Sequence, residues 1–218
     1  MPRITSVEPQ KKRTNRFNIY LDGKFGFGID AEMLLTNNIK IGQTLTQEKI
    51  SSIISQEESA KLTDKVLNFL SYRPRSQREI IDYLTKKIKS SQNISYKEAH
   101  DSQIIKNIIN KLEKYKYIDD LEFAKWWVLS RTRSRPKGPL VIKRELIAKG
   151  IDDTIIESVL STYKNQTEIA KELIAKKIKN WQSLSYVQIK NKVYSYLANR
   201  GFEFDTIKEV IANFVKKR

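Results

Sequence analysis

The sequence predicts a mainly α-helical protein: three tandem three-helix repeats that form an elongated, curved scaffold, preceded by a small N-terminal module with a β-hairpin. Segments 146–151 and 197–202 place leucine and glycine at the same spacing, and each precedes an aspartate and a further apolar set. Segment 84–112 has similar apolar positions without the glycine. Because tandem helical units build long surfaces, this pattern suits a binding protein better than an enzyme.

The N-terminal module is expected over residues 1–58. Residues 16–21 alternate between apolar and polar side chains, Asp22-Gly23 has the composition of a two-residue hairpin turn, and residues 24–29 return as the second strand. A further short strand is expected at 39–45, and Thr46 is expected to cap a helix that runs through Ile54.

The first repeat is expected over residues 59–119. Its first helix is predicted at 60–72 and its third at 104–115. Its second helix is predicted to begin at a capping box formed by Ser76 and Glu79. Between the last two lies an insertion, 89–103, which is expected to be a loop with one helical turn near Ser95–Glu98.

The second repeat is expected over residues 120–163. Asp119 and Glu122 have capping-box spacing before a stripe formed by Phe123, Ala124, Trp127 and Val128. A basic loop is expected over 131–139, with Pro139 in the first turn of the next helix. Gly150 is expected to close that helix in the left-handed conformation, and Asp152 or Asp153 to cap the last one.

The third repeat is expected over residues 164–218, with helices near 167–180, 185–200 and 205–215. Ser185 and Gln188 supply its capping box, and Gly201 its stop.

Charge is the second strong signal, since 41 basic and 25 acidic residues give a net charge of +16. Residues 1–58 hold eight basic and seven acidic side chains, so the excess lies in the helical repeats. Such a balance favours polyanionic partners, or proteins that themselves sit on nucleic acid, although a lysine-rich solvated surface is the alternative.

The sequence contains few of the residues and motifs that enzymes use for catalysis. His100 is the single histidine, there is no cysteine, and no phosphate-binding loop, zinc-protease motif or nucleophile elbow occurs. The pairs Asp119-Asp120 and Asp152-Asp153 could in principle hold magnesium, but both lie where a helix begins, so capping explains them better. We expect no enzymatic activity, no cofactor and no metal. No run approaches 18 apolar residues and no leader pattern is seen, so a cytoplasmic protein without membrane contact is expected.

Basic side chains recur where the first helix of a repeat meets the second. In the third repeat, Lys176, Lys177 and Lys179 occupy the same end of the first helix. If the repeats stack alike, these turns would align as a positive ridge that could pair with phosphates or carboxylates. Lys143, Arg144 and Lys149 could extend this ridge. The candidate partner-binding or nucleic-acid-binding residues are Arg73, Arg75, Arg78, Arg131, Arg133, Arg135, Lys137, Lys143, Arg144 and Lys149. Base stacking on Tyr72, Trp126, Trp127 or Trp181 is the alternative, with Trp127 assigned to the core.

The run 117–124, followed by Trp127-Val128, Arg131, Gly138 and 145–151, resembles the RecX family of bacterial recombination regulators, as does 69–80. The resemblance covers residues 59–160 well and the third repeat more loosely, and the N-terminal hairpin looks like the extension of longer members. The first repeat departs from the family pattern, because it lacks the closing glycine and carries an insertion at 89–103. These departures put in doubt the contacts that the first repeat would make in the groove of a RecA–DNA filament.

The resemblance implies a non-enzymatic modulator of RecA in DNA repair, homologous recombination and the SOS response. Such a protein lies in the groove of the RecA–DNA filament and mostly limits its growth, ATP hydrolysis and strand exchange. The alternative is a sequence-independent DNA- or RNA-binding protein that needs no RecA. A monomer is expected, because no long apolar stripe is left over. Replacing Arg131, Arg133 and Arg135 with glutamate is expected to abolish inhibition while the fold survives.

Overall fold

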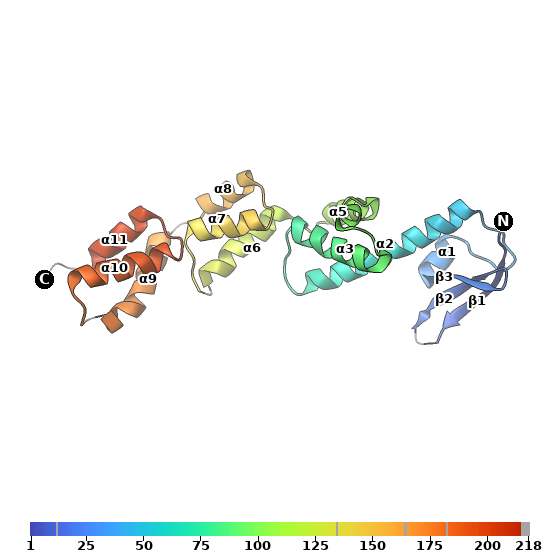
Figure 1. Ribbon diagram of the computed structural model, residues 1–218, viewed down its shortest axis with the longest axis horizontal. Coiled ribbons are helices and arrows are strands. Elements are labelled where there is room, and N and C mark those ends of the chain that lie inside the picture. Colours follow the sequence, from blue (N-terminus) through green and yellow to red (C-terminus); the bar gives the residue numbers. More distant parts are fainter. Residues whose placement is uncertain (12, 134, 164, 182, 215–218) are drawn as a thin grey trace. The chain divides into compact units, whose positions relative to one another are not determined.

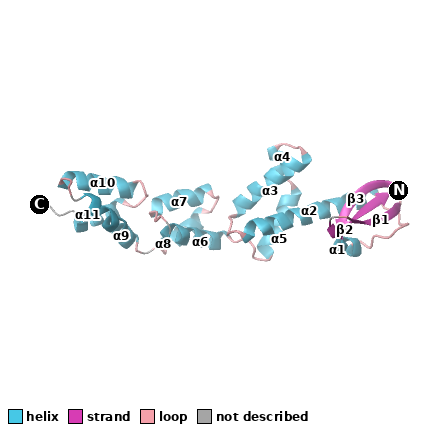
Figure 2. Cartoon of the chain, turned by 90° about the horizontal axis from the view of Figure 1, so that it is seen from below, coloured by secondary structure: helices cyan, strands magenta, loops and turns pink. Residues whose placement is uncertain are grey.

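A computed structural model describes residues 1–11, 13–133, 135–163, 165–181 and 183–214. It forms two compact units, one made of residues 1–72 and 84–110, the other of residues 73–83 and 111–218. Strands occur only near the N-terminus of the described chain, and helices form the rest (Figures 1 and 2). The mainly α-helical class and the small N-terminal β module are therefore confirmed.

The N-terminal sheet has three antiparallel strands, β1 (Ile4–Gln10), β2 (Arg13–Leu21) and β3 (Lys24–Asp30), in that order. The predicted hairpin is confirmed, since Leu21 pairs with Lys24 and Asp22 and Gly23 have φ values of 47° and 78°. Strand β1 and helix α1 (Ala31–Thr36) were not expected.

The strand expected at 39–45 does not form, and this prediction was wrong. Only an isolated bridge joins Arg3 to Thr44, because Gly42 turns the backbone with a φ of 89°. Ile39 and Leu45 are nevertheless buried in the core of the module together with Ile19 and Ile29.

Helix α2 (Gln47–Ser71) is continuous, whereas the sequence suggested two helices separated near residues 55–59. Thr46 caps it as expected, accepting a hydrogen bond from the Lys49 amide at 3.2 Å. The polar run inside α2 contains no glycine or proline, and its Glu57 is buried and bonded to Arg16 on β2. The boundary expected at residue 58 consequently lies within this helix.

The helices after α2 follow the predicted order, with end points shifted by a few residues. In the first repeat they are α3 (Gln77–Gln92), α4 (Tyr96–His100) and α5 (Gln103–Lys114). In the second they are α6 (Asp120–Arg133), α7 (Pro139–Ala148) and α8 (Asp153–Ser161). In the third they are α9 (Gln166–Ile178), a 3-10 turn (Lys179–Trp181), α10 (Tyr186–Ala198) and α11 (Phe204–Phe214).

Three of these helices correct two loop predictions. The insertion at 89–103 is largely helical, since α3 runs to Gln92 and Ser95 and Glu98 form a capping box for α4. The basic loop expected at 131–139 is shorter, because α6 continues through Arg133.

The glycine stops are confirmed, and each also makes a close contact. Gly150 and Gly201 have φ values of 77° and 79°, which suit only glycine well. The start of α7 contacts the backbone at Gly201 through two hydrogen bonds. The Gly138 amide donates to the Arg200 carbonyl at 2.8 Å, and the Leu140 amide donates to the Gly201 carbonyl at 3.0 Å. A Cβ atom on Gly138 would lie 2.3 Å from the Gly201 carbonyl, so no larger residue fits there without movement.

Candidate partner-binding surface

The first turn of α3 docks onto the end of α7, as the start of α7 docks onto the end of α10, but through side chains. The Ser76 hydroxyl accepts from the Glu79 amide at 3.2 Å, as the capping box predicts, and donates to the Lys149 carbonyl at 2.8 Å. Beside it, Gly150 leaves room for the Arg78 side chain, since a Cβ there would lie 2.6 Å from the Arg78 Cδ. The turn that closes α7 therefore supports the start of α3.

Both aspartates at the start of α6 are caps, but for different helices. The Asp119 carboxylate accepts from the Leu121 and Glu122 amides at 2.9 and 3.0 Å and caps α6. The Asp120 carboxylate accepts from the Gln77 amide at 2.8 Å and so caps α3. Burial raises the pKa of Asp120, and the bond from Gln77 opposes that rise. This pair is accounted for without a metal.

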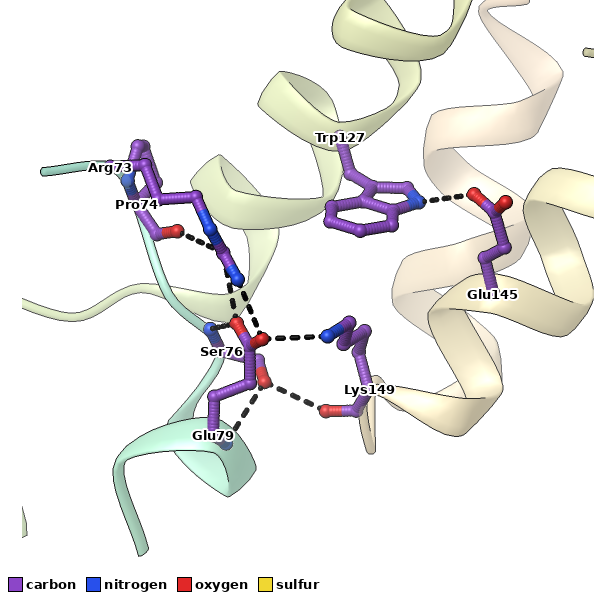
Figure 3. A network of polar contacts seen from close by, with 7 residues as sticks. All are labelled: Arg73, Pro74, Ser76, Glu79, Trp127, Glu145 and Lys149. Atoms are coloured by element: carbon purple, nitrogen blue, oxygen red, sulfur yellow. Dashed lines mark hydrogen bonds and ion pairs between the residues drawn. The ribbon is translucent and has the colours of Figure 1, made fainter. Parts of the chain in front are cut away.

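Glu79 lies at the centre of an ionic network (Figure 3). Its carboxylate accepts two hydrogen bonds from the Arg73 guanidinium, at 2.8 and 3.1 Å, and one from the Lys149 ammonium at 2.6 Å. Burial alone would raise the pKa of Glu79, but the bonds and charges of Arg73 and Lys149 outweigh it and lower the pKa to about 2. The Glu79 carboxylate consequently stays ionised at physiological pH.

The indole rings of Trp126 and Trp127 lie next to these cations and to Arg131. Trp127 is buried, and its ring nitrogen donates to Glu145 at 2.9 Å. The Arg131 guanidinium lies 4.3 Å from the Trp127 ring centre and donates to Glu145 at 2.6 Å. Lys149 lies 5.3 Å from the same ring, while Arg73 lies 5.8 Å from the ring of half-buried Trp126. Cations above aromatic faces are stabilised by the ring quadrupole.

A cavity of about 780 Å³ opens beside these rings. It is lined by Arg73, Trp126, Trp127, Ser130, Arg131, Arg135, Lys137 and Glu145. Two basic clusters that are far apart in the sequence thus meet at one cavity, with four cations and one carboxylate around it. We call these eight residues the junction pocket.

The remaining predicted residues lie outside the junction pocket. Arg78 is exposed and packs against Gly150, and Arg133 and Arg144 are exposed on their helices. Arg75 is half-buried, and burial lowers its pKa, with the charge of Arg73 acting in the same direction. Lys143 is half-buried. Lys176, Lys177 and Lys179 do not line the pocket either.

Sequence reasoning found the cations of the junction pocket but missed their anionic partners. The capping box pointed to Glu79 only as a cap, although a glutamate close to Arg73 in the sequence could have suggested a pair. Glu145 entered the sequence analysis only as part of segment 145–151, which carries the family resemblance, and not as a partner of Trp127 or Arg131. Trp127 was correctly assigned to the core.

His100 is exposed and bonded to Asp101 at 2.9 Å. Across the described ranges, no group of three histidine, cysteine or acidic residues is placed to hold a metal ion. A search of the same residues finds no helix that is both long and apolar enough to span a bilayer.

Four family models match this chain in order. The model described as the regulatory protein RecX N-terminal domain matches residues 2–46. The first, second and third three-helix domains of RecX match residues 64–90, 119–160 and 165–211.

Curated relatives and solved structures agree with these models. The chain is 39% identical to the regulatory protein RecX of Bacillus subtilis over 95% of this chain and 75% of that protein. It is 35% identical to that of Oceanobacillus iheyensis over 97% and 76% of the two chains. A crystal structure of regulatory protein RecX superposes with a TM-score of 0.71 and 28% identity, covering 98% of this chain and 100% of the other. RecX from Lactobacillus salivarius superposes with a TM-score of 0.62 and 32% identity, covering 73% and 97%.

Proposed function

This chain belongs to the RecX family, and from that premise we propose that it is a non-enzymatic regulator that binds the RecA–DNA filament and mostly inhibits its ATP hydrolysis and strand exchange. The proposed regulator acts in the cytoplasm as a monomer and needs no cofactor. Its role would lie in DNA repair, recombination and the SOS response.

The observation that carries the proposal is the junction pocket. It gathers cations from two segments, and these can pair with carboxylates on a protein surface or with phosphates of DNA. Of the cations that line the pocket, Arg135 is exposed and Lys137 is half-buried. Neither side chain is engaged in an ion pair within the described part of the chain. Both are therefore available to an anionic partner.

The structure changes which variant tests this proposal best. Arg131 covers Trp127 and bonds Glu145, so replacing it with glutamate would disturb the fold as well as the surface. Exposed Arg133 and Arg135 carry neither contact, and a double variant with glutamate at both positions changes only surface charge. The matched control reverses the exposed Lys106 and Lys111 of α5, which changes the net charge equally.

The test is RecA ATP hydrolysis on single-stranded DNA, with this protein titrated at near-physiological salt. We expect inhibition by the wild-type chain well below one molecule per RecA, because simple competition for DNA needs near-saturating amounts. The Arg133/Arg135 variant should need at least about tenfold more protein for half-inhibition, since each lost charge pairing at an interface weakens binding. The Lys106/Lys111 control should act like wild type. Full inhibition by a folded Arg133/Arg135 variant would remove this surface from the mechanism.

A sequence-independent nucleic-acid-binding role is the second candidate, and half-buried Trp126 beside four cations favours it. Single-stranded DNA is often bound by cations interleaved with aromatic rings. Under this alternative, ATP hydrolysis would fall only once the DNA is coated, and binding to naked DNA would account for the whole effect.

A further inference from the structure

A second surface, separate from the junction pocket, lies between α10 and α11. It is a groove of about 490 Å³. Its lining residues are Tyr186, Lys190, Asn191, Tyr194, Phe204, Ile207, Lys208, Ile211 and Ala212. We call this the third-repeat groove.

The third-repeat groove is an apolar face beyond the one that the two helices bury in the core. Val193 and Leu197 of α10 and Val210 of α11 are buried in the third-repeat core. On the groove side, by contrast, Phe204 is 64% exposed and Tyr194 is 46% exposed. Large apolar side chains gathered in a groove, rather than scattered singly, are typical of an interaction site.

The charge of the groove is uniformly positive. Exposed Lys190 and Lys208 lie on opposite helices along it, and no aspartate or glutamate is among its described lining residues. Two acidic residues of α11 adjoin lining residues: exposed Asp205 follows Phe204 in the first turn, and Glu209 pairs with Lys171 of α9 at 3.1 Å. An occupant that carries carboxylates around an apolar strip would therefore be complementary.

The dimensions of the groove suit a short helix. Residues 186, 190 and 194 follow one another at one-turn spacing on α10, and residues 204, 208 and 212 do so on α11. Eight residues of α-helix span about 12 Å, so each wall is about two turns long. An amphipathic helix that binds in a groove presents anchors at i, i+3 or i+4, and i+7, which also cover two turns.

The aromatic geometry argues against base stacking in this groove. The rings of Tyr194 and Phe204 lie edge to face, with an interplanar angle of 70° and centres 6.5 Å apart. Bases stack on flat ring faces, and this arrangement leaves a notch for a side chain in place of a parallel platform.

We propose that the third-repeat groove is a docking site for an acidic amphipathic helix of a partner protein, with apolar anchors seated between Tyr194, Phe204 and Ile211 and carboxylates paired with Lys190 and Lys208. The proposal does not depend on the action on RecA, because it rests on a different surface.

The test uses the intact 218-residue chain and two fluorescein-labelled 15-residue helical peptides. Both peptides carry leucine at i, i+4 and i+7, but one has glutamate and the other lysine at the flanking positions. Phe204→Ala removes an exposed anchor contact, and Tyr72→Ala is its control, since Tyr72 is 77% exposed and outside the groove. Lys208→Glu reverses a groove charge, and Lys176→Glu, on exposed Lys176 of α9, is its charge-matched control.

We expect the glutamate peptide to bind at least about tenfold more tightly than the lysine peptide, because only the former pairs with the groove lysines. Phe204→Ala and Lys208→Glu should each weaken binding by about fivefold or more, while both controls stay within about twofold of wild type. Fluorescence anisotropy gives the dissociation constants.

Several results would overturn the proposal. Absence of glutamate-peptide binding at about 1 mM would do so, since that is weaker than about −4 kcal/mol. Equal weakening by Lys208→Glu and Lys176→Glu would mean that net charge alone attracts the peptide. Two further outcomes would assign the groove to another occupant: loss of single-stranded DNA binding by Phe204→Ala, or loss of a wild-type dimer by the same variant in sedimentation.

Discussion

Replacing Glu79 with glutamine should destabilise the second compact unit mainly through the lost charge. Glutamine keeps the shape of the side chain and can still complete the capping box with Ser76. What disappears is the ion pair with Arg73 and Lys149, whose nitrogens lie 2.8 and 2.6 Å from Oε1. The Glu79 side chain is only 15% exposed, so water screens these contacts poorly.

The magnitude follows from the pKa of Glu79, which the folded state lowers from 4.5 to about 2. Since one pKa unit corresponds to about 1.4 kcal/mol, the charged carboxylate contributes about 3 kcal/mol at neutral pH. Between these two pKa values the unfolded chain binds more protons than the folded one. The contribution is therefore complete above pH 4.5 and is lost as the pH falls towards 2.

Urea unfolding followed by tryptophan fluorescence measures this effect, because Trp126 lies beside Arg73. Glu79→Gln should lower the free energy of unfolding by about 3 kcal/mol at pH 7 and by about 1 kcal/mol at pH 3. Glu122→Gln is the control, since Glu122 is 64% exposed and pairs only with Lys125, and such surface pairs contribute less than about 1 kcal/mol. A Glu79→Gln effect that is equal at pH 7 and pH 3 would refute the electrostatic reasoning.

Three other substitutions test the packing of the same unit by urea unfolding. Gly138→Ala should cost about 1–3 kcal/mol, because its Cβ would lie 2.3 Å from the Gly201 carbonyl; an unchanged midpoint would mean that the contact relaxes freely. Phe123→Ala should cost about 3–5 kcal/mol, since this 1% exposed ring packs against two indoles, and a loss below 1 kcal/mol would contradict its place in the core. Tyr163→Phe should cost about 1 kcal/mol at pH 7, because the Tyr163 hydroxyl donates to the Lys137 carbonyl at 2.9 Å. Burial raises the pKa of Tyr163 to about 12, so wild type should lose stability as the pH rises from 10 to 12 and the variant should lose less; parallel curves would contradict this.

Features of the fold that depend on neighbouring residues were predictable from the sequence. The capping boxes of Ser76 and Ser185, the hairpin turn at Asp22-Gly23 and the stop at Gly201 each involve residues within a few positions of one another. Local chemistry decides such features, so local patterns reveal them.

Features that depend on distant partners were not predictable in this way. Strand β1 contains Pro9 and lies at the edge of the sheet, where its pairing with β2 comes from tertiary structure. The sequence predicts a break in helix α2 near the polar residues 55–59, but the helix is continuous. Glu57, within this polar run, is buried because it bonds Arg16, which lies on β2, 41 residues earlier in the sequence. The same limit applies to the ionic network beside the junction pocket, where Glu79 and Lys149 are 70 residues apart.

The two helix-to-helix docking contacts differ in chemistry, and therefore in how strongly salt affects them. The start of α7 is fastened to α10 by two backbone hydrogen bonds, and added salt has little influence on such bonds. The start of α3 is fastened to α7 by the Ser76 hydroxyl and by the ion pair between Glu79 and Lys149. Glu79 also pairs with Arg73, which lines the pocket. An anion that binds Arg73 must therefore compete with Glu79, whose carboxylate also holds Lys149 at the end of α7. Because this contact contains an ion pair, added salt should weaken the contact between α3 and α7 more than the contact between α7 and α10.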